Sequence, residues 1–234
     1  MLYPFFSGMR SKLLFIAELL AIAAIFYLDY RHFRLGSKVP YLFLLGWISI
    51  RLRNLRWKEV GFCRPVLPFA RILFVGLVTG IGIEALELFA TQPLLTKLFN
   101  QGPDLHELQR LVGNTEILIL GIIVAWVLAA FGEELVYRGY LTNRAAEIFG
   151  ASKSAWITAA ILVTLLFGFA HFPQGPTGVT ENIIDGGILA AVYFATGRNL
   201  WAPIIAHGLT DTIDIVLIYL GWYPGLQQIL GLPA

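Results

Sequence analysis

The feature that most constrains this chain is its series of long apolar runs. A helical run of roughly 20 residues crosses the ~30 Å hydrocarbon core of a bilayer. Of the 234 residues, 57% are hydrophobic and only 14% are charged, and the mean hydropathy of +0.72 lies well outside the range of ordinary soluble domains. We therefore predict an all-α fold, a polytopic transmembrane helix bundle with about seven spans, within a range of about six to eight. The predicted spans are Leu13–Tyr30, Val39–Ile50, Leu67–Ala90, Thr115–Arg138, Ala155–Phe172, Asn182–Thr196 and Trp201–Leu220.

The segments between these runs indicate how the chain is organised. If the N-terminus lies inside, the inner segments carry more Lys and Arg than the outer ones, which favours a cytoplasmic N-terminus. The N-terminal MLYPFFSGMRSK has no charged n-region ahead of an h-region and no small-residue cleavage site before the first long run, so we expect a retained span and not a signal peptide. No soluble domain is visible. We treat residues 1–234 as one membrane-embedded domain, with N-terminal helices and interfacial segments at 1–114 and core helices at 115–220.

The charge and the cysteine content exclude other classes of protein. A formal net charge of +2 is too small to indicate nucleic acid as a partner. A single cysteine, Cys63, rules out an internal disulfide framework. The expected surroundings of the chain are the lipid bilayer.

The stretch FGEELVYRG, residues 131–139, places three charges at the end of an apolar run. Glu134 and Arg138 are four residues apart, so they lie on one helical face and can form an ion pair that offsets part of their burial cost. Glu133 points about 100° away and lacks that partner. Because an apolar setting disfavours an ionised carboxylate, such a group can exchange protons near neutral pH. Glu133 is the candidate base and Glu134 the candidate scaffold; the alternative is a charge cluster marking the inner membrane surface.

Two of the four histidines lie at the ends of other apolar runs. His171 follows Phe167 by one turn and precedes a Phe-Pro pair that we expect to end or kink its helix. His207 and Asp211 are four residues apart and share a face, with Asp214 one turn further. A lone histidine in a membrane helix is more often a packing or hydrogen-bonding residue. Two of them beside a glutamate pair indicate a catalytic site.

Together, EELVYR, FGFAH and HGLTD resemble, in order and type, the motifs EExxxR, FxxxH and HxxxN/D of the CPBP family. This family comprises the type II CAAX prenyl endopeptidases and their bacterial relatives, the Abi proteins, which are glutamic-type intramembrane proteases. The motifs cover residues 131–211, about a third of the chain. Each is weak alone, but three in this order on a polytopic chain are specific. The resemblance implies a multi-pass protein of a prokaryotic plasma membrane and an intramembrane endopeptidase.

The resemblance also implies a role for each matching residue. Glu133 corresponds to the catalytic glutamate, which with His171 activates a water for attack on a peptide carbonyl. Glu134 and Arg138 would hold the site in shape. His207 corresponds to one member of the pair that stabilises the oxyanion.

The other member of that pair is Asp211, where the family more often has Asn. An ionised Asp only accepts hydrogen bonds and would repel an oxyanion. Either Asp211 is protonated and donates, or it orients His207, which then acts alone. We favour the protonated donor, because an apolar helix and the nearby Asp214 both disfavour the ionised form.

The residue types fit peptide hydrolysis on their own, since one Glu and two His can supply a base, a donor and an acid. No HExxH, GxSxG-like or GxGD sequence serves another intramembrane chemistry. The resemblance implies no cofactor, and a membrane-associated protein or peptide as substrate. Two alternatives stay open: a non-proteolytic protein on the same scaffold, acting in toxin-peptide immunity or assembly, and a zinc-dependent protease. The zinc ligands would be Glu133, Glu134, His171 and His207.

The predicted span ends place Glu133 and His207 near the inner side and His171 near the outer side, which would keep a joint site apart. We therefore expect the fourth and fifth helices to run past these ends. Glu133 and His171 would then lie at mid-depth around a water-filled cavity.

Several other polar or small residues stand singly within the apolar runs. An ionisable side chain at the bilayer centre costs about 2.5–3.5 kcal/mol, so we expect each to pair with another helix or reach the interface. The ionisable ones are Glu18, Asp29, Arg71, Glu84, Glu87 and Asp185. In GLVTGIG, Gly76, Gly80 and Gly82 predict close packing of their helix.

Overall fold

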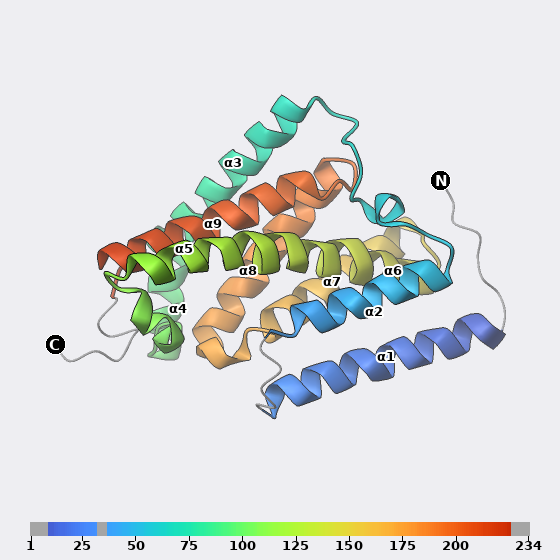
Figure 1. Ribbon diagram of the computed structural model, residues 1–234, viewed down its shortest axis with the longest axis horizontal. Coiled ribbons are helices and arrows are strands. Elements are labelled where there is room, and N and C mark those ends of the chain that lie inside the picture. Colours follow the sequence, from blue (N-terminus) through green and yellow to red (C-terminus); the bar gives the residue numbers. More distant parts are fainter. Residues whose placement is uncertain (1–8, 32–36, 226–234) are drawn as a thin grey trace.

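The computed structural model describes residues 9–31 and 37–225, which form helices and no strand (Figure 1). The prediction of an all-α fold is confirmed for this part of the chain. Its elements are α1 (Met9–Tyr30), α2 (Val39–Leu52), η1 (Trp57–Val60), α3 (Phe69–Leu86), η2 (Glu87–Thr91), α4 (Gln92–Phe99), η3 (His106–Leu111), α5 (Thr115–Val124), η4 (Ala125–Leu141), α6 (Thr142–Ile148), α7 (Lys153–Phe169), η5 (Phe172–Gln174), α8 (Gly175–Ala195) and α9 (Trp201–Leu220).

The number of candidate membrane spans differs from the prediction. In the described residues, four continuous helices are long and apolar enough to cross a bilayer, at Leu13–Tyr30, Phe69–Phe99, Thr115–Ile148 and Trp201–Leu220. The helices on either side of residue 171 are bent by 57° against each other and together make one broken span or a re-entrant loop. α2 has 14 residues, about 21 Å at 1.5 Å per residue, which is short of the hydrocarbon core. The candidate spans are therefore four or five, and the predicted count of about seven is not confirmed.

The longest helix carries Glu133 near its middle. α5, η4 and α6 run without a break from Thr115 to Ile148, past the predicted end at Arg138, so this expectation is confirmed. In η4 the backbone follows the wider π-helical pattern, in which each N–H bonds to the carbonyl five residues back. Such segments occur frequently at functional sites.

The expectation for the fifth helix was wrong. α7 ends at Phe169 and does not continue past His171. Pro173, which lacks an N–H to continue the helical ladder, lies in the short η5 turn that follows. His171 therefore occupies the bend between α7 and α8.

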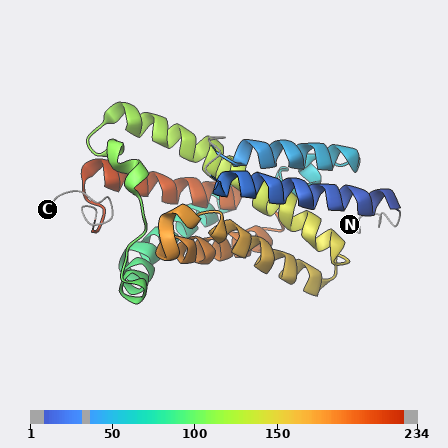
Figure 2. The same ribbon diagram turned by 90° about the horizontal axis from the view of Figure 1, so that it is seen from below.

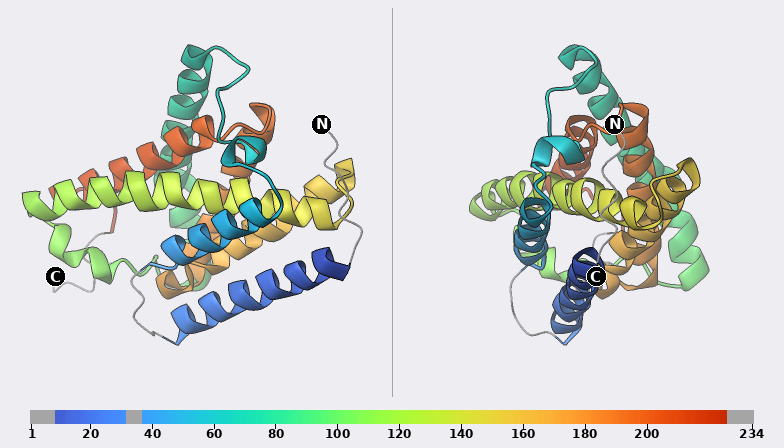
Figure 3. Two further views of the ribbon diagram at one scale, coloured as in Figure 1. Left: turned by 45° about the vertical axis from the view of Figure 1, so that its right-hand side comes forward. Right: turned by 90° about the vertical axis from the view of Figure 1, so that its right-hand side faces the viewer.

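α3 crosses α9 at close range (Figure 3). A Cβ atom at Gly76 would lie 2.7 Å from Ile205 Cβ, and one at Gly80 would lie 2.7 Å from the Ala206 carbonyl oxygen. The packing prediction is confirmed for these two glycines. It is wrong for Gly82, where a Cβ would meet no atom within 4 Å.

α1 lies along α2 at one edge of the bundle (Figure 2). Arg144 Nε donates to Glu18 Oε2 at 2.6 Å in a buried ion pair, and Lys38 Nζ lies 3.1 Å from Asp29 Oδ2. The expected pairing of Glu18 and Asp29 is thus confirmed. Lys38 also donates to the Ala170 carbonyl oxygen at 2.9 Å, so it ties the start of α2 to the bend after α7.

Candidate active site

A cavity of about 390 Å³ lies among η4, α8 and α9. Four of the predicted site residues line it together: Glu133, His171, His207 and Asp211. Its volume falls within the range of sites for small molecules and short peptide segments. Residues up to 78 positions apart in the sequence can therefore act on one bound group, and the predicted joint site is geometrically possible.

Glu134 and Arg138 lie behind the cavity wall as a buried ion pair. Arg138 Nη1 donates to Glu134 Oε1 at 2.7 Å, which is the pair that their spacing predicted. Arg138 Nη2 donates to the Gly186 carbonyl oxygen at 2.8 Å, and its guanidinium carbon lies 4.6 Å from the Phe167 ring centroid. A Cβ on Gly186 would lie 2.9 Å from Phe167, so only glycine leaves this room. The pair fastens η4 to both α7 and α8.

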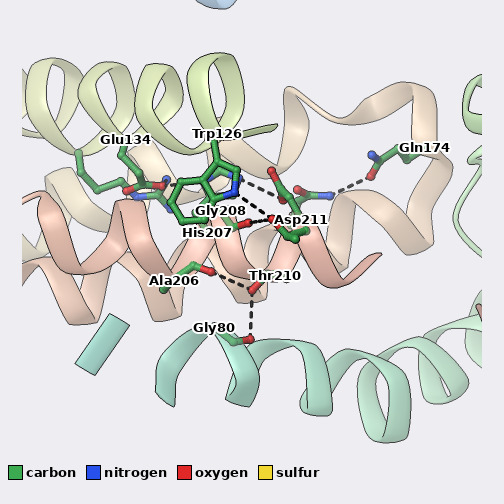
Figure 4. A network of polar contacts seen from close by, with 12 residues as sticks. Gly80, Trp126, Glu134, Gln174, Ala206, His207, Gly208, Thr210 and Asp211 are labelled. Carbon is green, nitrogen blue, oxygen red and sulfur yellow. Dashed lines mark hydrogen bonds and ion pairs between the residues drawn. The ribbon is translucent and has the colours of Figure 1, made fainter. Parts of the chain in front are cut away.

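His207 lies between two carboxyl groups, as Figure 4 shows. Its Nδ1 lies 3.0 Å from Glu134 Oε1, and its Nε2 lies 3.6 Å from Asp211 Oδ1. Glu134 therefore binds a histidine as well as an arginine. The sequence did not indicate this contact, because the two residues are 73 positions apart.

The proton count of this arrangement follows from its geometry. Glu134, which already accepts from Arg138, accepts from Nδ1–H of His207. A neutral imidazole then has a bare lone pair on Nε2, which would face the Asp211 carboxylate unfavourably. One further proton on either Nε2 or Asp211 removes this repulsion. Nε2 and Asp211 Oδ1 are 3.6 Å apart, too far for a hydrogen bond between them, so either group could donate to a ligand in the cavity when it holds this proton.

Glu133 differs from its neighbour in one carboxylate oxygen. Its Oε2 atom is buried and has no hydrogen-bond donor within the described part of the protein. Since buried carboxylate oxygens normally accept hydrogen bonds, this atom is free for a ligand such as water. The widened η4 helix thus turns one glutamate into the cavity and the next into the wall.

His171 is oriented by the backbone of the preceding turn. Its Nδ1 lies 2.9 Å from the Phe167 carbonyl oxygen, which can only accept, so Nδ1 carries the proton. In the neutral ring Nε2 is then an acceptor. Lys38 fixes the adjacent Ala170 carbonyl oxygen. The bend at the end of α7 therefore presents a proton acceptor to the cavity.

A second layer of contacts, which the sequence did not reveal, holds α9 against η4 (Figure 4). Trp126 Nε1 donates to Thr212 Oγ1 at 3.0 Å. A Cβ on Gly208 would lie 2.7 Å from the Trp126 ring. Gly208 follows His207 directly, so this close contact sets the position of the imidazole. A glycine in the middle of an apolar helix was the one available signal.

The rest of the cavity contains carboxyl groups that sequence reasoning treated singly or missed. We call them the acidic group: Glu84, Glu87, Glu181, Asp185 and Asp214. All but Glu84 line the cavity. No ion pair joins any of them to a cation in the described residues. The expected pairing with another helix is present for Glu84, Glu87 and Asp185, but the partners are acids: Glu84 interacts with Asp214 of α9, and Glu87 with Asp185 of α8.

Within the described residues, one set of three or more His, Cys, Asp or Glu side chains converges closely enough for a metal ion: Glu84, Glu87 and Asp214. The alternative zinc ligands Glu133, Glu134, His171 and His207 do not form such a set there.

Comparison with known proteins supports the family suggested by the motifs. Residues 115–213 match the family model described as type II CAAX prenyl endopeptidase Rce1-like. This stretch is less than half of the chain, and it contains Glu133, His171, His207 and Asp211. No match was found among curated proteins or among solved structures.

Proposed function

We propose that this chain is an intramembrane endopeptidase, because residues 115–213 match the family model of the Rce1-like CAAX prenyl endopeptidases. Its substrate is a peptide bond of a membrane-associated protein or peptide. Its apolar helices indicate an integral membrane protein. The observation that carries the proposal is the convergence of Glu133, whose Oε2 has no described partner, with two histidines on one cavity.

The first step is activation of water. Water donates one hydrogen bond to the Glu133 carboxylate and the other to Nε2 of His171. Glu133 takes the proton as the water oxygen bonds to the peptide carbonyl carbon. The electron pair of the carbonyl double bond moves to its oxygen, which becomes an oxyanion.

The second step breaks the peptide bond. The carbonyl re-forms as the C–N bond breaks, and protonated Glu133 returns its proton to the leaving amine. The products are a carboxyl and an amino terminus, so the atoms of one water are consumed. No covalent intermediate with the protein is required.

Stabilisation of the oxyanion falls to His207 and Asp211. A proton on either of them provides a donor at the cavity, and Glu134 and Arg138 hold the imidazole in place from behind. A fixed donor aimed at developing charge in a site poor in water is a large contribution to catalysis. If Asp211 is the donor, this proton lies on its carboxyl group. An Asn side chain at the same position would donate from its amide instead.

The test is hydrolysis by the purified chain in liposomes. Membrane-embedded peptides, with and without a prenylated C-terminal cysteine, are incubated with the protein, and products are identified by mass spectrometry. We expect cleavage by the wild type and by Glu116→Gln, which changes an exposed carboxylate on α5. Glu133→Gln should be inactive. Cleavage by Glu133→Gln at the wild-type rate would contradict the assigned base, and no cleavage by any protein would favour a non-proteolytic role.

A further inference from the structure

We propose that the acidic group is a binding site for one hard divalent cation, of the Mg²⁺, Ca²⁺ or Mn²⁺ class, which joins α3 and η2 to α9. Asp214 lies about two helical turns beyond His207 along α9. It is about one turn beyond Asp211 and lines the same cavity. The proposed ligands are nevertheless different residues from those proposed to act on the peptide bond.

The spacing of the oxygens fits an ion. Glu84, Glu87 and Asp214 each offer one carboxylate oxygen, and these atoms all lie within 4.8 Å of one another. Ligand oxygens lie about 2.0–2.6 Å from Mg²⁺ or Ca²⁺, so oxygens on opposite sides of an ion are about 4–5 Å apart. The three side chains could therefore bind one ion without movement of the backbone.

The second observation is a buried carboxylate that no donor group of the described residues reaches. Glu84 is 4% exposed, and neither of its oxygens has a hydrogen-bond donor in the part of the protein described. It faces Asp214, whose Oδ1 is also buried and without a donor. Two facing carboxyl groups need either a shared proton or a cation between them, because leaving such charge buried and unpaired is very costly.

The neighbouring carboxyl groups add to the need for positive charge. Asp185 faces Glu87, and one oxygen each of Asp185 and Glu181 is buried without a donor in the described residues. Without a cation, each facing pair of carboxyl groups would need a shared proton of its own, so several protons would have to be bound at once. A divalent ion with bound water neutralises the group more completely, since the waters can donate to the outer carboxylates.

The chemistry of the donors selects the class of cation. Every ligand atom is a carboxylate oxygen, with no sulfur and no imidazole, which suits Mg²⁺, Ca²⁺ or Mn²⁺ better than Zn²⁺. The helix widens into its π-helical segment at Glu87, which turns this carboxylate toward the others. Gly80 lets α3 approach α9 one turn before Glu84. The same close packing that joins the two helices thus brings their acidic side chains together.

The experiment measures binding, so it does not depend on hydrolytic activity. The full chain is purified in detergent, stripped with a chelator and titrated separately with calcium, magnesium and manganese chloride by calorimetry. We expect one ion per chain, with a dissociation constant below ~1 mM, the weak end of protein calcium sites, and a higher unfolding temperature with the ion. Asp214→Asn and Glu87→Gln should each weaken binding at least about tenfold. Glu116→Gln should bind as the wild type does.

Three results would overturn the proposal. A wild type that binds none of the three salts would assign shared protons to these carboxyl groups. Unchanged affinity in both folded variants would place the ion elsewhere. Loss of binding in His207→Ala, with Asp214→Asn unaffected, would move the ion to the catalytic residues. Because the two variants lie on separate helices, one of them can still test the cation site if the other folds poorly.

Discussion

The carboxyl groups near the two ends of the cavity differ in their partners. At one end Glu134 is held by Arg138 and His207, and Asp211 lies beside His207. At the other end no ion pair joins the acidic group to a cation of the described residues. A carboxylate held by fixed donors has one geometry, which is what a positioned catalytic group needs. Carboxylates gathered without cations need something else to bind them.

Glu133 belongs to the catalytic end, yet it resembles the far end in having an unpartnered oxygen. The comparison explains why. A general base must keep a lone pair for the proton that it takes, so the neighbouring Glu134 carries the structural contacts instead. Mutations should therefore affect activity at Glu133, stability at Glu134 and cation binding in the acidic group.

The largest expected effect is on catalysis. Glu133→Gln keeps the volume of the side chain and removes the base, so hydrolysis should fall by about 10²–10⁴-fold, the usual contribution of a general base. Its circular dichroism spectrum and unfolding midpoint should match the wild type. A folded variant with full activity would show that another group takes the proton.

Glu134→Gln should act mainly on stability. It leaves Arg138 and His207 without their shared carboxylate, and breaking a buried ion pair costs about 3–5 kcal/mol. Equilibrium unfolding in detergent measures this loss. If Glu134→Gln were as stable as wild type and Glu133→Gln unfolded, the assignment of base and scaffold would be reversed.

Asp214→Asn should have the opposite sign when no cation is present. Removing one of several facing carboxyl groups relieves repulsion and the cost of keeping them neutral, so the chelator-treated variant should be more stable than chelator-treated wild type. The gain in the free energy of unfolding should be on the order of 1 kcal/mol, which is about the free energy of a one-unit change in pKa. A variant less stable than wild type under these conditions would show that the acidic group needs no outside cation. The matched control is Glu116→Gln, which should change neither value.

The smallest effect is expected at Asp211. If it is the protonated donor, Asp211→Asn should keep most of the activity, since the amide donates in its place. The wild type has this donor only while the carboxyl is protonated, so its activity should fall as pH rises through that titration, and the variant should lack the decline. A decline at high pH in both enzymes would refute the donor reading.

The sequence predicted the all-α class and the pair Glu134–Arg138 because both depend on spacing along one helix. It predicted the span count poorly. The bend at His171 makes α7 and α8 parts of one broken span, and α2 is too short to cross alone. Hydropathy reports neither the bend nor the helix ends, so it counted these segments as three spans.

The contacts that sequence reasoning missed are those between distant helices. Glu134 meets His207, and Glu84 meets Asp214, from separate apolar runs. In the sequence each acidic residue was an isolated polar side chain, expected to pair with another helix or to reach the interface. Only the crossing of α3 and α9 shows that their neighbours are other acids.

The most direct test of this division is the rate of hydrolysis per folded molecule before and after exhaustive treatment with EDTA, which removes Mg²⁺ and Ca²⁺ as well as Zn²⁺. If Glu133 and the histidines suffice for catalysis and the cation belongs to the acidic group, chelation should lower the unfolding temperature and leave the rate unchanged below it. A rate that falls to that of Glu133→Gln, and returns only when zinc is added, would contradict this and assign the catalysis to a metal-bound water.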